Sequence, residues 1–157
     1  MSVHLAQAYE TLSARVDHSE PPSEWYEISK DRVNAFADIT LDHQWIHVDE
    51  ERSRNGPFGK TIAHGHLTLS IMGQLPSPQP RERLRLEGHR LTINYGFDRV
   101  RFPAPVPVGS RIRMQSTLRR VEVKGGMIEL MNEIVVEVEG QDKPCCVAES
   151  LTRLVLQ

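Results

Sequence analysis

The sequence is poor in cysteine and in aromatic residues. Its only two cysteines are adjacent, Cys145 and Cys146, and adjacent cysteines rarely pair because their disulfide is strained. A disulfide framework is therefore excluded, and the chain fits a reducing, cytoplasmic setting. Because apolar and polar residues alternate around the pair, we expect a strand in which one cysteine is buried and the other exposed.

An excess of charge of either sign is also missing. The 157 residues hold 19 Lys and Arg against 21 Asp and Glu, a formal net charge of −2, so we expect neither a nucleic-acid partner nor a polybasic membrane surface. No apolar run approaches the roughly 20 residues that cross a bilayer, and Met1–Leu5 lack the features of a secretory signal. The length predicts one domain over residues 1–157, with an N-terminal helix and linker over 1–24.

Several common catalytic motifs are absent as well. The sequence contains no GxSxG, no GxxxxGK followed by Ser or Thr, no GxGxxG and no HExxH. Serine-hydrolase, P-loop, Rossmann and zinc-protease chemistry are therefore poorly supported.

Helical patterns fill the first part of the chain. Apolar residues at helical spacing predict a helix over residues 4–16, and a proline-containing linker leads to a short strand over Trp25–Ile28. Ser29 is placed to cap a second helix, which should end near Leu41. A charged short helix is expected over residues 49–54.

A third helical region is apolar on nearly all sides. It follows His64 and Gly65 and includes Leu67, Leu69, Ile71, Met72 and Leu75, before prolines stop it. Such a pattern predicts a long helix buried within a core.

The second half of the chain alternates apolar with polar residues, as strands of a half-covered sheet do. Glycine-containing turns after Val123 and Val138 indicate hairpins. The expected strands are Leu91–Tyr95, Arg99–Phe102, Ile112–Leu118, Ile128–Val138 and Cys146–Val155. The chain as a whole is therefore predicted to be α+β, with one long buried helix against a curved antiparallel sheet of about five strands and additional N-terminal helices. Because such a sheet leaves an edge strand open, we expect a homodimer.

Asp42 and His47 are candidates for proton chemistry. They lie five residues apart in a short connector, and a carboxylate and an imidazole at this spacing can hold one water between them. Gly65 offers an unpaired N–H at the start of the buried helix, where it could hold a developing oxyanion. Each residue also has a purely structural explanation: a turn aspartate, a core histidine and a glycine kept for close packing.

A metal site is the competing interpretation of the histidines. His43 and His47 are spaced i, i+4, and His64 and His66 follow. The connector is not convincingly helical, however, so we do not expect a metal.

The motifs resemble those of a known family. Residues 37–49 (ADITLDHQWIHVD) are similar to the hydratase motif of MaoC-like, (R)-specific enoyl-CoA hydratases, also called 3-hydroxyacyl-thioester dehydratases. The runs GPFG at 56–59, IAHG at 62–65, NYG at 94–96 and RFPAPV at 101–106 resemble the nodulation-protein-N-like branch of that family. The resemblance implies a hot-dog fold and reversible hydration of trans-2-enoyl thioesters to (R)-3-hydroxyacyl thioesters.

The resemblance also assigns roles to residues. It implies that Asp42 and His47 are the catalytic pair and that the Gly65 amide binds the thioester oxygen. Gln44 and Trp45 stand where the family usually has asparagine and proline. Many members carry a supporting serine at the position of Gly73; here the candidate substitute is Ser70, one turn earlier.

The implied substrate is a thioester of coenzyme A or of an acyl carrier protein, with no metal or organic cofactor, because the thioester itself acidifies C2. The coenzyme A phosphates need cations, and the best candidate is Arg101, inside a matched run; Arg81, Arg83, Arg85 and Arg99 are further candidates. Two alternatives remain open: a non-catalytic module that binds acyl thioesters, and a hot-dog thioesterase.

Overall fold

The computed structural model of the chain describes residues 2–76 and 86–157. Within these ranges, no helix is long and apolar enough to cross a membrane. In chain order the elements are α1 (Val3–Ser13), β1 (Tyr26–Glu27), α2 (Lys30–Thr40), α3 (Trp45–Val48), α4 (Glu50–Arg54), α5 (Gly65–Ile71), the 3₁₀ helix η1 (Met72–Gln74), β2 (His89–Arg101), β3 (Arg111–Lys124), β4 (Met127–Val138) and β5 (Cys146–Leu156).

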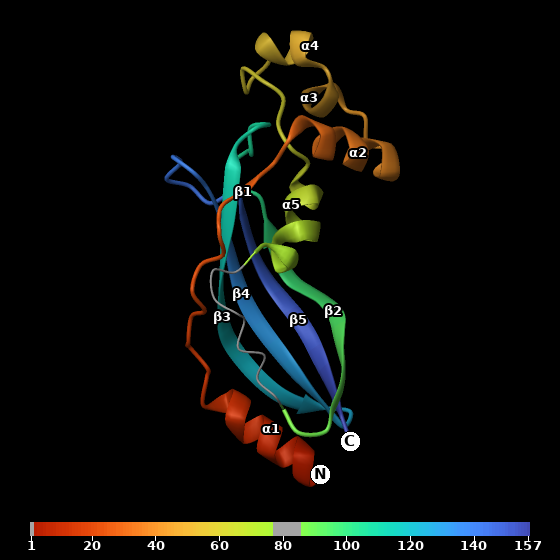
Figure 1. Cartoon of the computed structure of the whole chain (residues 1–157), viewed down its shortest axis with the longest axis vertical. Coiled ribbons are helices and arrows are strands. Elements are labelled where there is room, and N and C mark those ends of the chain that lie inside the picture. Colours follow the sequence, from red (N-terminus) through yellow and green to blue (C-terminus); the bar gives the residue numbers. More distant parts are fainter. Residues whose placement is uncertain (1, 77–85) are drawn as a thin grey trace.

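The strands form one curled antiparallel sheet in the order β1-β3-β4-β5-β2. Figure 1 shows α5 lying against the sheet in its upper half and α1 across its lower end, while α2, α3 and α4 stand together beyond the upper end. The predicted α+β architecture, a helix held against a curved sheet of five strands, is confirmed.

Two hydrophobic clusters fill the covered face of the sheet. The cluster under α5 contains Leu67 and Met72 together with strand residues such as Val136 and Ala148. The cluster under α1 contains Leu5 and Leu12 with partners on β3, β4 and β5. Because side chains alternate along a strand, burying these residues sends their neighbours to the opposite face.

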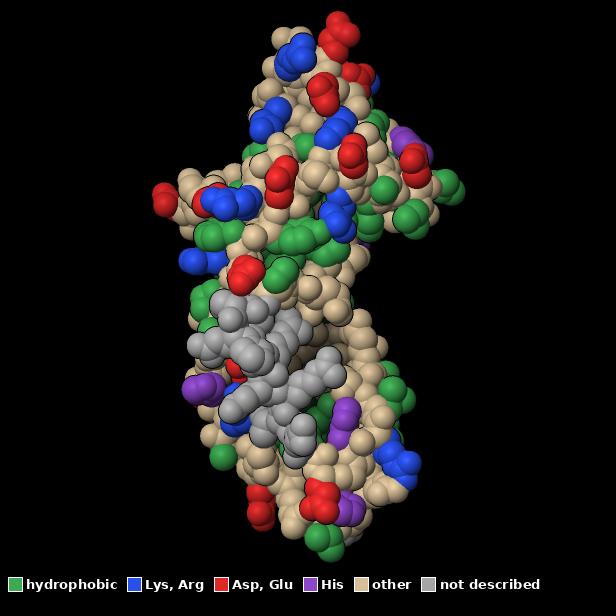
Figure 2. All heavy atoms as spheres, viewed as in Figure 1, with side chains coloured by type: hydrophobic (Ala, Val, Ile, Leu, Met, Phe, Trp, Pro, Cys, Tyr) green, Lys and Arg blue, Asp and Glu red, His purple; other side chains and the backbone are tan. Residues whose placement is uncertain are grey.

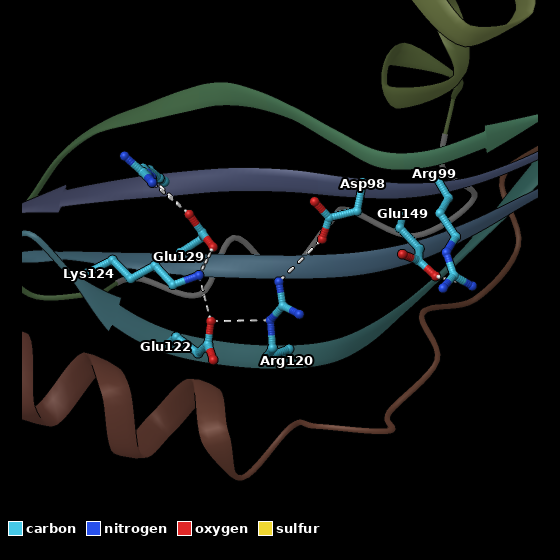
Figure 3. A network of polar contacts seen from close by, with 8 residues as sticks. Asp98, Arg99, Arg120, Glu122, Lys124, Glu129 and Glu149 are labelled. Atoms are coloured by element: carbon cyan, nitrogen blue, oxygen red, sulfur yellow. Dashed lines mark hydrogen bonds and ion pairs between the residues drawn. The ribbon is translucent and has the colours of Figure 1, made fainter.

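That opposite face carries a network of charged side chains (Figure 3). Its centre is Glu129, only 3% exposed, which accepts hydrogen bonds from Lys124 at 2.6 Å and Arg153 at 2.9 Å. Arg153 in turn lies over the ring of Tyr95, 3.4 Å from its centroid. The network therefore ties β3, β4, β5 and the edge strand β2 together.

The N-terminal caps follow the sequence closely. The Ser29 hydroxyl accepts a hydrogen bond from the Arg32 amide at 3.3 Å and starts α2, and Asp49 caps α4 in the same way at 2.9 Å. Helix α2 ends as expected, at Leu41, which adopts a left-handed backbone with φ of 62°. This reversal turns the chain directly into the connector that holds Asp42.

Four local predictions are corrected by the structure. The expected long helix is seven residues long and then tightens into η1, because Gly73 is a poor helix former and Pro76 blocks continuation. The two expected strands over 91–102 are one irregular strand, β2, with register shifts that absorb Gly96. The N-terminal helix ends at Ser13 rather than at residue 16.

The fourth correction concerns the cysteines, which are free and both buried rather than one of each kind. Cys146 starts β5 on its covered face, while Cys145 precedes the strand and packs into the same cluster from the loop. Alternation does not apply to Cys145 because it lies outside the strand.

Candidate active site

Three segments meet where the helical end joins the sheet. They are the connector after α2, the short helix α3 and the start of α5, and they bring together Asp42, His47 and His64. One nitrogen or carboxylate oxygen from each of these residues lies within 4.8 Å of the others. Figure 2 shows hydrophobic side chains gathered at this junction, with acidic and basic side chains interspersed beyond them.

His47 is buried, with 6% of its surface exposed, and it lies in the single turn of α3 rather than in a loop. Its Nδ1 is 2.7 Å from the carbonyl oxygen of Ile62. A ring nitrogen facing a carbonyl must carry the hydrogen, so Nδ1 donates and Nε2 keeps a free lone pair. Burial is the main cause that lowers the pKa of His47 below the ordinary 6.5, and the neighbouring His64 contributes in the same direction. The neutral ring is thus favoured as a proton acceptor.

Asp42 is exposed at the surface of the connector. From the described residues its carboxylate accepts one hydrogen bond, from the Gln44 amide at 3.3 Å, which leaves most of its acceptor capacity unused. The Gln44 side chain is exposed, and its backbone carbonyl accepts the amide hydrogen of His47 at 2.9 Å. Gln44 therefore joins the two residues through its backbone.

His64 has a part in the site that the sequence did not reveal. Its ring stacks on that of His47, with centroids 3.7 Å apart and planes 25° from parallel, and its Nε2 donates to the backbone carbonyl of Asp42 at 2.9 Å. The sequence signals were its place among the possible metal-ligating histidines and its position directly before Gly65 in a matched run.

Trp45 leaves the path of the connector intact. It occupies the first position of α3, where proline is well tolerated because the amide there has no helical partner. The preceding Gln44 has φ −56° and ψ 135°, the conformation that a residue before proline adopts. The indole itself packs on Gly56 and lies under the guanidinium of Arg52, 4.4 Å from the ring centroid.

Gly65 opens α5 beside this cluster. Its amide has no hydrogen-bond acceptor in the part of the chain that the structure describes, as expected for the first residue of a helix. A Cβ at this position would lie 2.9 Å from the ring of Phe102. The glycine is therefore needed for a close approach, and the free amide lies beside an aromatic wall.

A cavity of about 310 Å³ adjoins Gly65. Its walls include Phe58, Phe102, Val106, Thr68 and Cys145. The polar side chains among these are the Thr68 hydroxyl and the Cys145 thiol, and burial raises the pKa of that thiol to about 12. The cavity is thus a mostly apolar space next to an unpaired backbone donor.

Comparison with known proteins identifies the family of this site. Residues 12–140 match the model of the MaoC like domain. The chain belongs to the MaoC-like family. It is 50% identical over 145 residues to 3-hydroxyacyl-thioester dehydratase Z of Mycobacterium tuberculosis (strain ATCC 25618 / H37Rv), covering 92% of this chain and 93% of that protein.

Two further relatives of this MaoC-like chain extend the comparison. Nodulation protein N of Rhizobium leguminosarum bv. viciae is 39% identical over 144 residues, covering 90% of this chain and 87% of the relative. The solved (R)-hydratase from A. caviae superposes with a TM-score of 0.66 at 21% identity, covering 89% and 96% of the two chains. The predicted family and its hot-dog fold are therefore confirmed.

The remaining residues predicted to bind substrate make hydrogen bonds to their own elements in this MaoC-like chain. Ser70 is exposed, and its hydroxyl donates to the His66 carbonyl at 2.7 Å, so its hydrogen is used within α5 and is not available to Asp42. Arg101 ends β2, and its one hydrogen bond to a described residue goes to the adjacent Val100 carbonyl at 2.7 Å. Arg81, Arg83 and Arg85 lie outside the described residues.

The histidines predicted as possible ligands are separated in the same way. His43 pairs with Asp38 at 2.8 Å, and His66 is exposed beside Phe102. His47 and His64 do lie together, but their rings present stacked faces, whereas metal ligation needs lone pairs in the ring planes to converge on one point.

Proposed function

We propose that the chain catalyses the reversible hydration of trans-2-enoyl thioesters to (R)-3-hydroxyacyl thioesters, and is thus a hydro-lyase. The observation that carries the proposal is the pairing of Asp42 with His47. Within the described residues, most of the acceptor capacity of the Asp42 carboxylate is unused, and Nε2 of His47 has no hydrogen-bond partner. A carboxylate oxygen of Asp42 and a ring nitrogen of His47 lie within 4.8 Å of each other, close enough for one water to hydrogen-bond to both. The identity to 3-hydroxyacyl-thioester dehydratase Z supports the same reaction.

The proposed steps use only this chain's residues. Asp42 and His47 orient one water, and its oxygen attacks C3 of the enoyl group while an O–H bond breaks toward the pair. The electrons of the double bond move onto the thioester, and the Gly65 amide donates to its oxygen as charge develops there. The pair then delivers a proton to C2, so that the elements of water are added and both residues return to their starting states.

We infer that the cavity beside Gly65 takes the acyl chain. Its volume of about 310 Å³ lies at the lower end of the range for small-molecule pockets, about 300–1,000 Å³. An apolar chain gains free energy there, because the walls are largely carbon. Initial rates with trans-2-enoyl-CoA of increasing chain length test this assignment, with an optimum expected and then a decline once the chain exceeds the cavity.

Arg101 is proposed to bind the phosphates of coenzyme A. Its guanidinium is exposed, and no ion pair to it is found within the described residues. Arg101→Ala should raise KM for crotonyl-CoA but not for crotonyl-N-acetylcysteamine, which has the thioester without the nucleotide. An equal effect on both substrates would remove this role.

We also propose a homodimer. The edge strand β2 pairs only with β5 in the described chain and exposes Leu91, Ile93 and Tyr95, and an open edge with apolar residues favours pairing with a second copy. Light scattering coupled to size exclusion should give twice the chain mass.

The free thiols of the two cysteines support a reducing, cytoplasmic setting.

The function itself is tested with purified protein and crotonyl-CoA or a longer enoyl-CoA, following the loss of enoyl-thioester absorbance. Asp42→Asn is matched by Asp38→Asn, a neighbouring exposed carboxylate that pairs with His43 instead. Hydration that is lost in the first variant and kept in the second supports the proposal. Binding without turnover would indicate a binding module, and release of free thiol would indicate a thioesterase.

A further inference from the structure

His64 contacts both members of the catalytic pair at once. It precedes α5 as its N-cap residue and is 3% exposed. Its ring stacks on that of His47 of α3, with centroids 3.7 Å apart, and contacts the tilted ring of Phe36 of α2, with centroids 5.0 Å apart. A buried ring in contact with two other rings has little freedom to rotate, because core packing holds side chains in single rotamers.

The edge of the His64 ring holds the connector that carries Asp42. Nε2 donates to the Asp42 carbonyl at 2.9 Å, and in the neutral ring this leaves Nδ1, which is buried and has no partner within the described residues. A buried polar atom without a partner has a cost of about 1–3 kcal/mol. The ring is retained here despite that cost, which points to a role for its other nitrogen and its face.

The Asp42 carboxylate has little other support. It is exposed, and it follows a left-handed residue, Leu41, in a connector whose hydrogen bonds here are local. Among the described residues, the bond from His64 is the one that joins the backbone of Asp42 to a distant part of the chain, across 22 residues. The Ile62 carbonyl, two residues before His64, orients His47 in the same manner.

We propose that His64 is a positioning residue for the hydration reaction: it sets the distance between the Asp42 carboxylate and the Nε2 of His47. Its Nε2–H fixes the backbone of Asp42, and its face fixes the plane of the His47 ring. It does not touch the reacting atoms. The inference rests on the proposed function, since it concerns the geometry of that pair.

Two variants separate the two contacts. His64→Phe keeps an aromatic face for His47 and removes the donor to Asp42, whereas His64→Gln keeps an amide donor and removes the face. His18→Phe and His18→Gln, at an exposed residue after α1, are the matched controls.

The expected result is a loss in kcat, normalised to folded protein, with KM nearly unchanged. Because a misplacement of about 1 Å can cost about 100-fold in rate, His64→Phe should lower kcat about 10- to 100-fold, and His64→Gln should recover part of that loss. The His18 variants should match the unmodified protein. If both His64 variants keep its kcat per folded molecule, or if they change KM alone, the proposal is overturned.

A second measurement does not depend on turnover. In protein labelled with ¹⁵N and ¹³C, His64→Phe should shift the carbonyl resonance of Asp42 and the amide resonance of Gln44, whereas His18→Phe should shift neither. Unmoved resonances would overturn the positioning role. If the unmodified protein hydrated no enoyl-CoA, the proposed function would fail first, and the resonances would still decide whether His64 holds the connector.

Discussion

His47 and Glu129 are both ionisable side chains that the fold hides from solvent, and their surroundings differ in one respect. His47 uses one ring nitrogen on the Ile62 carbonyl and leaves the other free. Glu129 has both carboxylate oxygens occupied, by Lys124 and Arg153. Burial alone therefore does not mark a functional group, because within the described residues only His47 of these two keeps a nitrogen lone pair that no hydrogen bond uses.

The pKa values of the two residues move in the same direction for different reasons. Burial lowers the pKa of His47 because it disfavours the imidazolium. Hydrogen bonds from Lys124 and Arg153 lower the pKa of Glu129, against the opposing effect of its burial. His47 is thus held in its neutral form, whose lone pair can accept a proton, and Glu129 is held as a structural anion.

The largest effect is expected where the lone pair is free. Asp42→Asn and His47→Gln should each lower kcat/KM for crotonyl-CoA about 10²- to 10⁴-fold, the range found for general acid–base groups. Asp42→Asn should leave the urea midpoint unchanged, because the side chain is exposed. If both variants kept their activity, the free nitrogen of His47 and the free carboxylate oxygen of Asp42 would have no role in catalysis.

For Glu129, whose carboxylate oxygens both accept hydrogen bonds, we expect a loss of stability without a loss of activity. Glu129→Gln should lower the free energy of unfolding by about 1–3 kcal/mol, because hydrogen bonds to charged groups are lost from a buried site, and should leave kcat unchanged. Urea denaturation checks this, with Glu137→Gln in an exposed pair with Arg113 as the control, expected to cost less than about 1 kcal/mol. A catalytic defect in Glu129→Gln would contradict the assignment.

A smaller effect is expected outside the pair, on the outer side of α3. Trp45→Pro should keep kcat within about threefold, since the backbone before it already has a pre-proline conformation. It should lower the unfolding free energy by about 1–2 kcal/mol, because the contacts of the indole with Gly56 and Arg52 are lost. A collapse of kcat would show that the indole itself shapes the site.

The smallest effect is expected in the dependence on pH. Because the pKa of His47 is lowered, kcat/KM for hydration should fall in acid with an apparent pKa below 6.5, which a pH–rate profile measures. The free energy of unfolding should also fall as the pH drops from 6.5 toward that lowered pKa, since the unfolded chain binds a proton first. The corresponding loss from Glu129 should begin only below about 4.5 and be missing in Glu129→Gln.

Many of the helices, strands and candidate site residues could be predicted from local sequence patterns. Ser29 as a cap, the end of α2 at Leu41 and the alternation along β3, β4 and β5 are short-range consequences of side-chain chemistry. The Asp-to-His spacing, together with the matched runs, indicated the candidate pair. Element lengths were less certain, because a glycine in a strand or helix, such as Gly96 or Gly73, has its effect through the neighbours it must fit.

What local pattern could not supply is which groups remain unpaired. His47 donates its ring hydrogen to the Ile62 carbonyl, 15 residues away, and His64 reaches Asp42 across 22 residues. Residue types and spacing decided the family, the elements and the candidate chemistry. Tertiary packing alone decided that both carboxylate oxygens of Glu129 are hydrogen-bonded, that the Ser70 hydroxyl bonds within its own helix and that His47 keeps a free nitrogen. The reason is that a hydrogen bond depends on where the fold places groups that are distant in the sequence.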